Sequence, residues 1–385
     1  MSTLDRYIAR QYLVNIIALV VVLFAFIITI DLSLNFDDFM SMAQTRGATA
    51  EGEPSAVRKL LLAVFLVFDY WWPKLIQLFN YLIGLVVIGA MGFTCAQMAR
   101  HREFVAALAG GVSLFRLLRP LLLVALLMTT IQAFNFEFVI PRLADLIQRN
   151  RDQASQRRLD DLPVRLVPDS MRRLFYARSF DAEAGVLTDL TVLERSPLGP
   201  AVRAIVAPRA VWRDGGWDLE GGFAESRSSQ QAPRQAVARI ETDLDPVAIK
   251  VARFAGYSQS LSWRQISELL RRPELLGLGA SPEGRDPTLI RQRVEELERI
   301  RFGRVAIMLS NLLSLLIVTP FFLRKEPSNV LLSSLKAAPL AVVGVLGGVL
   351  GASAAVPGLP PSVGVFVPAL ILLPMAIAAV TSIRS

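Results

Sequence analysis

Histidine and cysteine are almost missing from this 385-residue sequence, which contains one of each, His101 and Cys95. A disulfide within the chain is therefore impossible, and these two side chains cannot form a metal site unless carboxylates complete it. A histidine-based triad outside the cytoplasm is also excluded, because His101 lies in a short basic segment of cytoplasmic character. The sequence has no G-x-x-x-x-G-K-[ST] motif and cannot bind ATP through a P-loop. We expect no catalytic residues, no metal and no cofactor.

Charged residues are also scarce: they make up 19% of the chain, against about 25% in an average soluble domain. Long apolar runs lie at both ends of the chain, and a polar block fills the middle, which is typical of a membrane–soluble–membrane organisation. The net charge of +8 would fit nucleic acid. However, much of the excess arginine flanks the apolar runs, where basic residues act as topology signals, so we expect no nucleic-acid binding.

The apolar runs predict six transmembrane helices, at about 13–36, 73–98, 117–140, 305–323, 335–356 and 363–383. The short loops that follow the second and fourth spans are basic, which places them and both termini in the cytoplasm and residues 142–304 in the periplasm. We expect a loop over 40–54. We also expect a separate interfacial helix over 57–72, because aromatic residues end it and Pro73 begins the second span. Pro141 is expected to end the third span.

The polar middle of the chain has the pattern of a β domain. Short β-favouring runs at 174–177 and 190–193 alternate with turn signals at 197–200 and 214–216. Short strands at close spacing predict an all-β, sandwich or jellyroll-like domain over 142–260. A helical connector over 261–304 follows. The predicted fold is thus a six-span membrane protein, with helices 1–3 in residues 1–141, helices 4–6 in 305–385 and a periplasmic β insertion between helices 3 and 4.

Two short patterns are candidates for function. The segment from Glu103 is too short to span a bilayer, and we expect a cytoplasmic helix over about 103–111, ending at a glycine pair. In the fifth span, small residues recur at four-residue spacing, which lets another helix approach closely. These are Gly344, Gly347, Gly348 and Gly351. The spacing alone does not distinguish packing within the chain from a contact between subunits or at a gate.

Several segments resemble the LptF/LptG permease family of the lipopolysaccharide export system. The opening Leu4-Asp5-Arg6-Tyr7-Ile8 resembles the family's N-terminal signature, closer to the LptG branch. The loop resembles the family's N-E-L-x-A-L-R-A-x-G-x-S motif, with matches at Glu103, Ala106, Ala109, Gly111 and Ser113. The sequence departs from the family at Ala107 and Leu108, which replace a leucine and an arginine, and at Asp31, Asp37 and Asp38, where the family often has basic residues.

The resemblance implies a permease subunit of an ABC transporter that extracts lipopolysaccharide, or a similar lipid, from the inner membrane. Its partners would be an LptB-like ATPase dimer, a homologous LptF-like subunit and an LptC-like periplasmic protein. Glu103, Ala106, Gly111 and Ser113 would form the coupling site for the ATPase. Ile27, Asp31 and the glycines of the fifth span would lie at lateral gates. The sequence leaves two alternatives open: a permease for lipoproteins or another lipid, and a periplasmic scaffold or sensor without transport.

Overall fold

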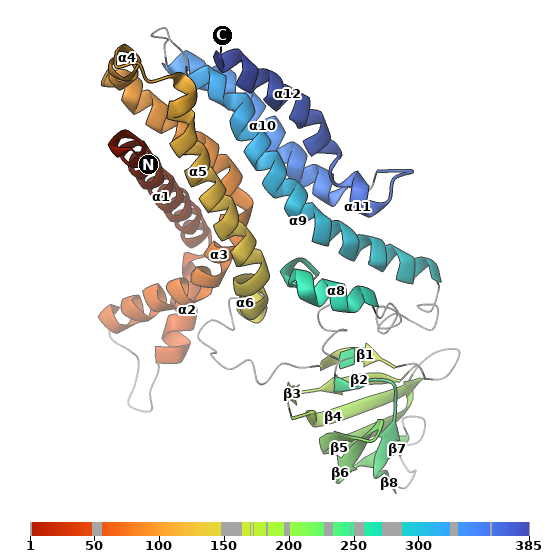
Figure 1. Cartoon of the computed structure of the whole chain (residues 1–385). Helices are drawn as coiled ribbons and strands as arrows, with labels where there is room; N and C mark the ends of the chain where they lie inside the picture. Colours follow the sequence, from red (N-terminus) through yellow and green to blue (C-terminus); the bar gives the residue numbers. More distant parts are fainter. Residues whose placement is uncertain are drawn as a thin grey trace. The chain divides into compact units, whose positions relative to one another are not determined.

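The computed structural model describes residues 2–47, 56–147, 164–169, 171, 173–181, 184–195, 201–226, 234–246, 248–249, 258–271, 287–323, 330–354 and 356–384. It divides into two compact units. The helical unit comprises Met1–Ser155 and Glu298–Ser385, and the β unit comprises Gln156–Leu297. Figure 1 shows the elements of each unit.

Six helices of the described chain are long and apolar enough to cross a membrane, as predicted. Their elements are α1 (Thr3–Leu34), α3 (Ala56–Arg100), α5 (Leu114–Phe134) with its continuation, α9 (Pro287–Phe322), α10 (Val330–Ser353) and α12 (Val367–Arg384). The shorter helices of this unit are α2 (Phe36–Gly47), α4 (Glu103–Ala109) and α11 (Pro361–Gly364). A π-helical turn, η1 (Asn135–Val139), joins α5 to α6 (Ile140–Ile147).

Three expected boundaries differ from the structure. Pro73 does not begin a helix but lies buried inside α3, so residues 57–72 are the first turns of one 45-residue helix. Such a helix is roughly 67 Å long at about 1.5 Å per residue, well beyond one bilayer crossing. Pro141 likewise lies inside α6 rather than ending a helix. Residues 40–47, expected in a loop, are helical in α2, and the rest of that loop lies outside the described residues.

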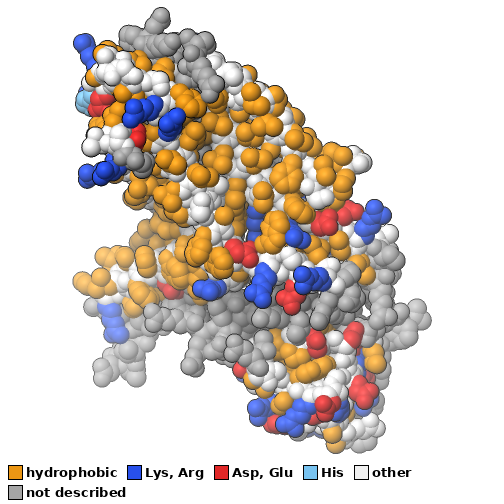
Figure 2. Space-filling model, viewed as in Figure 1, with side chains coloured by type: hydrophobic (Ala, Val, Ile, Leu, Met, Phe, Trp, Pro, Cys, Tyr) orange, Lys and Arg blue, Asp and Glu red, His pale blue; other side chains and the backbone are white. Residues whose placement is uncertain are grey.

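The helices of this unit pack through small residues and expose apolar ones. Gly84 of α3 lies so close to Asn311 of α9 that a Cβ at position 84 would overlap the asparagine side chain. Val21 and Phe26 of α1, by contrast, are 59% and 62% exposed. Hydrophobic side chains cover most of the visible face of the helices (Figure 2). An apolar exterior of this kind is suited to lipid or to another membrane helix.

The β unit contains one antiparallel sheet, nine-stranded in the described residues, with strand order β1-β2-β4-β5-β6-β9 and with β3, β7 and β8 off this path. The strands are β1 (Val164–Pro168), β2 (Leu174–Ala177), β3 (Ser179–Asp181), β4 (Val186–Arg195), β5 (Ala201–Arg213), β6 (Gly216–Glu220), β7 (Phe223–Ser226), β8 (Gln235–Ala236) and β9 (Arg239–Glu241). The long strand β5 pairs with β7 near its start and with β6 at its end. The predicted β insertion between the third and fourth spans is confirmed, and its paired strands are antiparallel.

The predicted turn at 214–216 joins β5 to β6. Asp214 and Gly215 have φ of 44° and 79°, and a two-residue hairpin turn of this kind matches the right-handed twist of the strands. The turn signal at 197–200 lies outside the described residues. Within the helical connector expected over 261–304, Trp263–Arg271 form α8 and residues from Pro287 onward belong to α9, while 272–286 lie outside the described residues.

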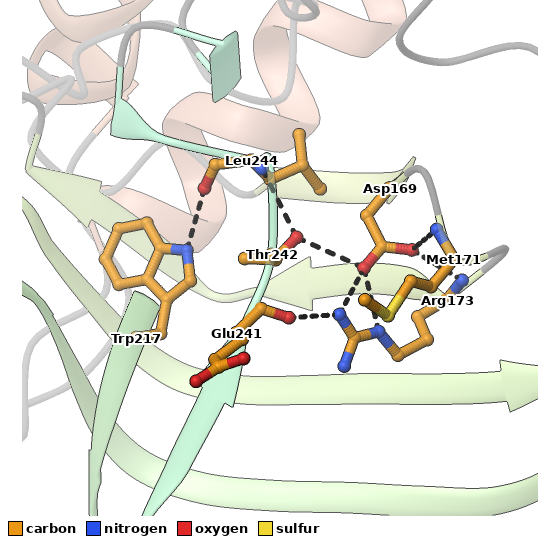
Figure 3. A network of polar contacts seen from close by, with 7 residues as sticks. All are labelled: Asp169, Met171, Arg173, Trp217, Glu241, Thr242 and Leu244. Atoms are coloured by element: carbon orange, nitrogen blue, oxygen red, sulfur yellow. Dashed lines mark hydrogen bonds and ion pairs between the residues drawn. The ribbon is translucent and has the colours of Figure 1, made fainter. Parts of the chain in front are cut away.

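A polar network closes one end of the β unit (Figure 3). Asp169, which follows β1, accepts hydrogen bonds from the backbone N–H of Met171 and Arg173 at 2.9 and 2.8 Å. It also accepts one from Thr242 Oγ1 at 3.1 Å, after β9. Nearby, the fully buried Trp217 donates from Nε1 to the Leu244 carbonyl at 2.9 Å. The network therefore joins the turn between β1 and β2 to the chain beyond β9.

Candidate functional site

The short helix α4 lies between two residues whose backbone has a positive φ. Arg102, just before it, has φ of 55°, and Gly111, just after it, has φ of 75°. The N–H of Gly111 donates to the Leu108 carbonyl at 3.0 Å, which closes the helix. A side chain at position 111 would be strained in this conformation. Ser113 then caps α5, its Oγ accepting from the Arg116 N–H at 3.3 Å. Gly111 and Ser113 thus shape the loop.

Glu103, the first residue of α4, has two carboxylate oxygens in different situations. Its Oε1 accepts a hydrogen bond from the Tyr7 hydroxyl of α1 at 2.9 Å. Its Oε2 is buried and has no hydrogen-bond partner within the described residues. One oxygen is therefore held, while the other is an unused acceptor, and an unpaired carboxylate oxygen favours a cationic or N–H donor partner.

The rest of α4 has one side buried against the helical unit and one side exposed. Phe104 is buried in the helical unit, whereas Val105 and Ala106 are exposed. The preceding basic residues, Arg100 and Arg102, are exposed as well. Figure 2 shows charged side chains gathered at the end of the helices that carries α4. This end of the unit has small, apolar and basic groups that a partner protein could contact.

An apolar cavity of about 540 Å³ lies among α1, α3, α9 and α10. Its lining includes Leu19 and Leu23 of α1, Phe93 of α3, Phe322 of α9, and Ala338 and Val342 of α10. Every described side chain of the lining is apolar. Its size is that of a typical ligand site, but such a site normally carries a few polar groups. A cavity without any is suited to hydrocarbon.

The expected gate residues of α1 lie beyond this cavity. Ile27 is half-buried, and Asp31 joins the far end of α1 to α3. The Trp71 Nε1 donates to Asp31 Oδ2 at 3.0 Å, and Asn35 Nδ2 donates to Oδ1 at 3.0 Å. Asp31 is therefore engaged in holding two helices together.

The glycines of α10 mostly contact neighbouring helices of the same chain. A Cβ at Gly344 would overlap Ser314 of α9, and one at Gly348 would lie 2.6 Å from Ser310 Cβ. A Cβ at Gly351 would overlap Pro368 of α12. A Cβ at Gly347 would meet no atom within 4 Å. Three of the four positions thus close-pack α10 within the subunit, and Gly347 faces open space.

Tyr7 is the site residue that sequence reasoning did not assign. It belongs to the N-terminal signature, but its partner lies 96 positions away. No group of three or more histidine, cysteine or acidic residues that could hold a metal occurs in the described part of the chain.

Residues 57–382 match the family model of the lipopolysaccharide export system permease LptF/LptG. This range begins in α3 and ends in α12, so it includes the α4 loop, the β unit and most of the cavity wall. No curated protein matches the chain.

Proposed function

Because the chain belongs to the lipopolysaccharide export system permease LptF/LptG family, we propose that it moves lipopolysaccharide, or a lipid of similar build, out of the inner membrane as one subunit of an ABC transporter. The observation that carries the proposal is the apolar cavity between α1 and α10. Acyl chains enter such a cavity favourably because their apolar surface is removed from water or matched by apolar side chains. A polar solute would find no hydrogen-bond partner there.

Energy for the movement would come from a separate subunit, an LptB-like ATPase dimer, since the chain has no P-loop. The α4 loop is the proposed contact. The half-buried Glu103 would pair with a basic side chain of the ATPase, and the small, exposed Ala106 would let the partner approach closely. Basic residues at 100–102 favour a cytoplasmic location for this loop, which is where an ATPase would be found.

The β unit would then lie in the periplasm. Its antiparallel sheet with a buried apolar interior would receive the acyl chains and pass them to an LptC-like protein. The exposed apolar residues of α1 and α10, together with Gly347, would face an LptF-like second permease subunit across a lateral gate. Ile27 and Asp31 would border that gate from the α1 side.

The first test is affinity purification of the full chain from membranes, followed by mass spectrometry of bound proteins and lipids. We expect an ATPase, a second six-span subunit and a lipid with several acyl chains. Recovery of a lipoprotein would favour the alternative cargo. Recovery of neither an ATPase nor lipid would favour a scaffold or sensor and overturn the proposal.

A matched pair of variants then tests the cavity. Ala338→Trp places a large ring in the cavity, whereas Leu370→Trp adds the same ring to a side chain of α12 that is 59% exposed. We expect Ala338→Trp to lower the amount of bound lipid while the ATPase is still recovered, and Leu370→Trp to leave the lipid in place. Equal lipid in both variants would remove the cavity from the proposal.

A charge reversal tests the ATPase contact. Glu103→Lys should leave the chain inserted in the membrane, because Glu103 lies at the start of an exposed loop helix. We expect ATP hydrolysis in the assembled complex to become uncoupled from export. Unchanged hydrolysis and unchanged export would remove Glu103 from the mechanism.

A further inference from the structure

Five residues of α1 recur at every fourth position, Tyr7, Gln11, Asn15, Leu19 and Leu23. Side chains four positions apart form a continuous ridge along a helix, and such ridges pack into grooves of neighbouring helices. We call these five residues the α1 ridge. Its first three side chains are polar and its last two are apolar, so the ridge changes character halfway along.

The polar half of the ridge is hydrogen-bonded to the end of α3 and to α4. Beyond the Tyr7 contact with Glu103, Gln11 Nε2 donates to Gln97 Oε1 at 2.8 Å. Asn15 Nδ2 donates to Thr94 Oγ1 at 2.9 Å. The same Asn15 nitrogen is 3.2 Å from Gln97 Oε1, so one acceptor joins two successive turns of α1.

The apolar half continues along α3 to the cavity. A Cβ at Gly89 would lie 3.2 Å from Leu19 Cδ2, so this leucine packs directly on the glycine. Leu19 and Leu23 both line the cavity. The ridge therefore runs without interruption from the carboxylate of the α4 loop to the cavity wall, and each partner position on α3 precedes the last, as expected for antiparallel helices.

The N-terminal turns of α1 are also its best-packed part. Its described buried residues are Ile8, Tyr12 and Ile16, whereas Val21 and Phe26 further along are exposed. Hydrogen bonds between polar side chains fix the register of two helices because each donor needs a particular acceptor. The N-terminal half of α1 is thus bound to α3 and α4 in one register.

We propose that Tyr7 is a positioning residue that ties the α4 loop to α1, so that α1, the end of α3 and α4 move together and a displacement of α4 shifts Leu19 and Leu23 in the cavity wall. The inference rests on the proposed function. Tyr7 also holds the Glu103 carboxylate through Oε1, which fixes the position of the buried Oε2. The ridge is the physical link between the ATPase contact and the lipid site.

Two tyrosine variants test this role in the full complex in lipid nanodiscs. Tyr7→Phe removes the hydroxyl that binds Glu103, and Tyr81→Phe removes a hydroxyl of α3 outside the α1 ridge, from a side chain of similar exposure (42% against 47%). We expect Tyr7→Phe to lower the lipid moved per ATP by about three- to tenfold, the effect of losing one modest hydrogen bond. Tyr81→Phe should leave that ratio unchanged.

A cross-link provides the rescue. In a Cys95→Ala background, Gln11→Cys with Gln97→Cys breaks the polar half of the ridge and should lower the lipid moved per ATP. Joining the two cysteines with a short bifunctional reagent restores the link between α1 and α3, and we expect it to restore the ratio. A cross-link that lowers the ratio further would mean that α1 slides along α3, and would overturn the inference.

Measurements on the wild-type complex distinguish a failure of the proposed function from a failure of the proposed role of Tyr7. If it moves no lipid, the proposed function fails and the inference fails with it. If it moves lipid while Tyr7→Phe has an unchanged ratio, or while Tyr81→Phe loses as much as Tyr7→Phe, only the role of Tyr7 is overturned.

Discussion

Replacing Asp169 by alanine removes a carboxylate that accepts four hydrogen bonds at one end of the β unit. Its side chain is fully buried, and that of its ion-pair partner Arg173 is 11% exposed, with 2.7 Å between the charged atoms. The alanine leaves Arg173 Nε, the Thr242 hydroxyl and two backbone N–H groups without their acceptor, and the guanidinium keeps only its bond to the Glu241 carbonyl. Breaking a buried pair from one side typically costs about 3–5 kcal/mol, and we expect a loss in that range.

The loss can be measured by hydrogen exchange on the full chain. Amides of β2 and β4, which pair with each other, exchange through opening of the unit, so their rates report its stability. A loss of about 3–5 kcal/mol corresponds to exchange roughly 150- to 5,000-fold faster, at a factor of ten for each 1.36 kcal/mol. Amides of α3 and α5 serve as an internal reference, because they belong to the helical unit.

A matched control is the ion pair between Arg239 and Asp218, in which both side chains are 37% exposed. Asp218→Ala removes the same chemical group, but a half-exposed pair contributes only about 0–1 kcal/mol. We expect its exchange to rise by less than about fivefold. If the exchange of Asp169→Ala rose as little as that of Asp218→Ala, the network of Figure 3 would not stabilise the β unit, and the expected loss of about 3–5 kcal/mol would be refuted.

Four further substitutions, one of them a control, test the helical unit. Gly344→Ala should lower the melting temperature of the subunit, because its Cβ overlaps Ser314 and overpacking costs about 1–3 kcal/mol; Gly347→Ala, in open space, should leave it unchanged, and equal effects would contradict the close packing of α10 on α9. Gly111→Ala should destabilise the α4 loop by about 1 kcal/mol through its left-handed backbone, seen as faster exchange there and weaker recovery of the ATPase. Ser113→Ala removes the cap of α5 at a cost of about 1 kcal/mol; unchanged exchange at the start of α5 would refute the cap.

The spans were predictable because length and composition decide whether a helix can cross a bilayer. The positions of the helix ends were not predictable from length and composition. Pro73 removes one backbone hydrogen bond, which normally ends a helix, yet α3 continues through it. Proline is tolerated inside membrane helices when neighbouring groups satisfy the freed backbone. The helical conformation of residues 40–47 in α2 was also not predicted, for a different reason. Its composition is polar, but Phe39 and Ala43, four residues apart, are buried against Ala63 and Leu66 of α3.

The candidate site was predictable only in part, because its residues act at different ranges. Glu103 could be identified from a local motif, and in the described residues its buried Oε2 has no hydrogen-bond partner. The four-residue spacing of glycines showed that α10 has a close-packing face, but periodicity does not identify which helix it meets. The Tyr7 contact depends on the antiparallel packing of α1 on α3, which no local pattern specifies.

The change from polar to apolar side chains along the α1 ridge has a physical reason if the apolar cavity takes acyl chains as proposed. Gln11 and Asn15 need specific acceptors, so a shift of register there would leave polar groups unpaired in an apolar surrounding. Leu19 and Leu23 make non-directional contacts, and an acyl chain can replace one leucine contact with another at little cost. The polar half can therefore hold α1 in register with α3 while the apolar half exchanges protein contacts for lipid. A ridge that was polar throughout would resist the exchange, and one that was apolar throughout would not transmit a displacement of α4 in a fixed register.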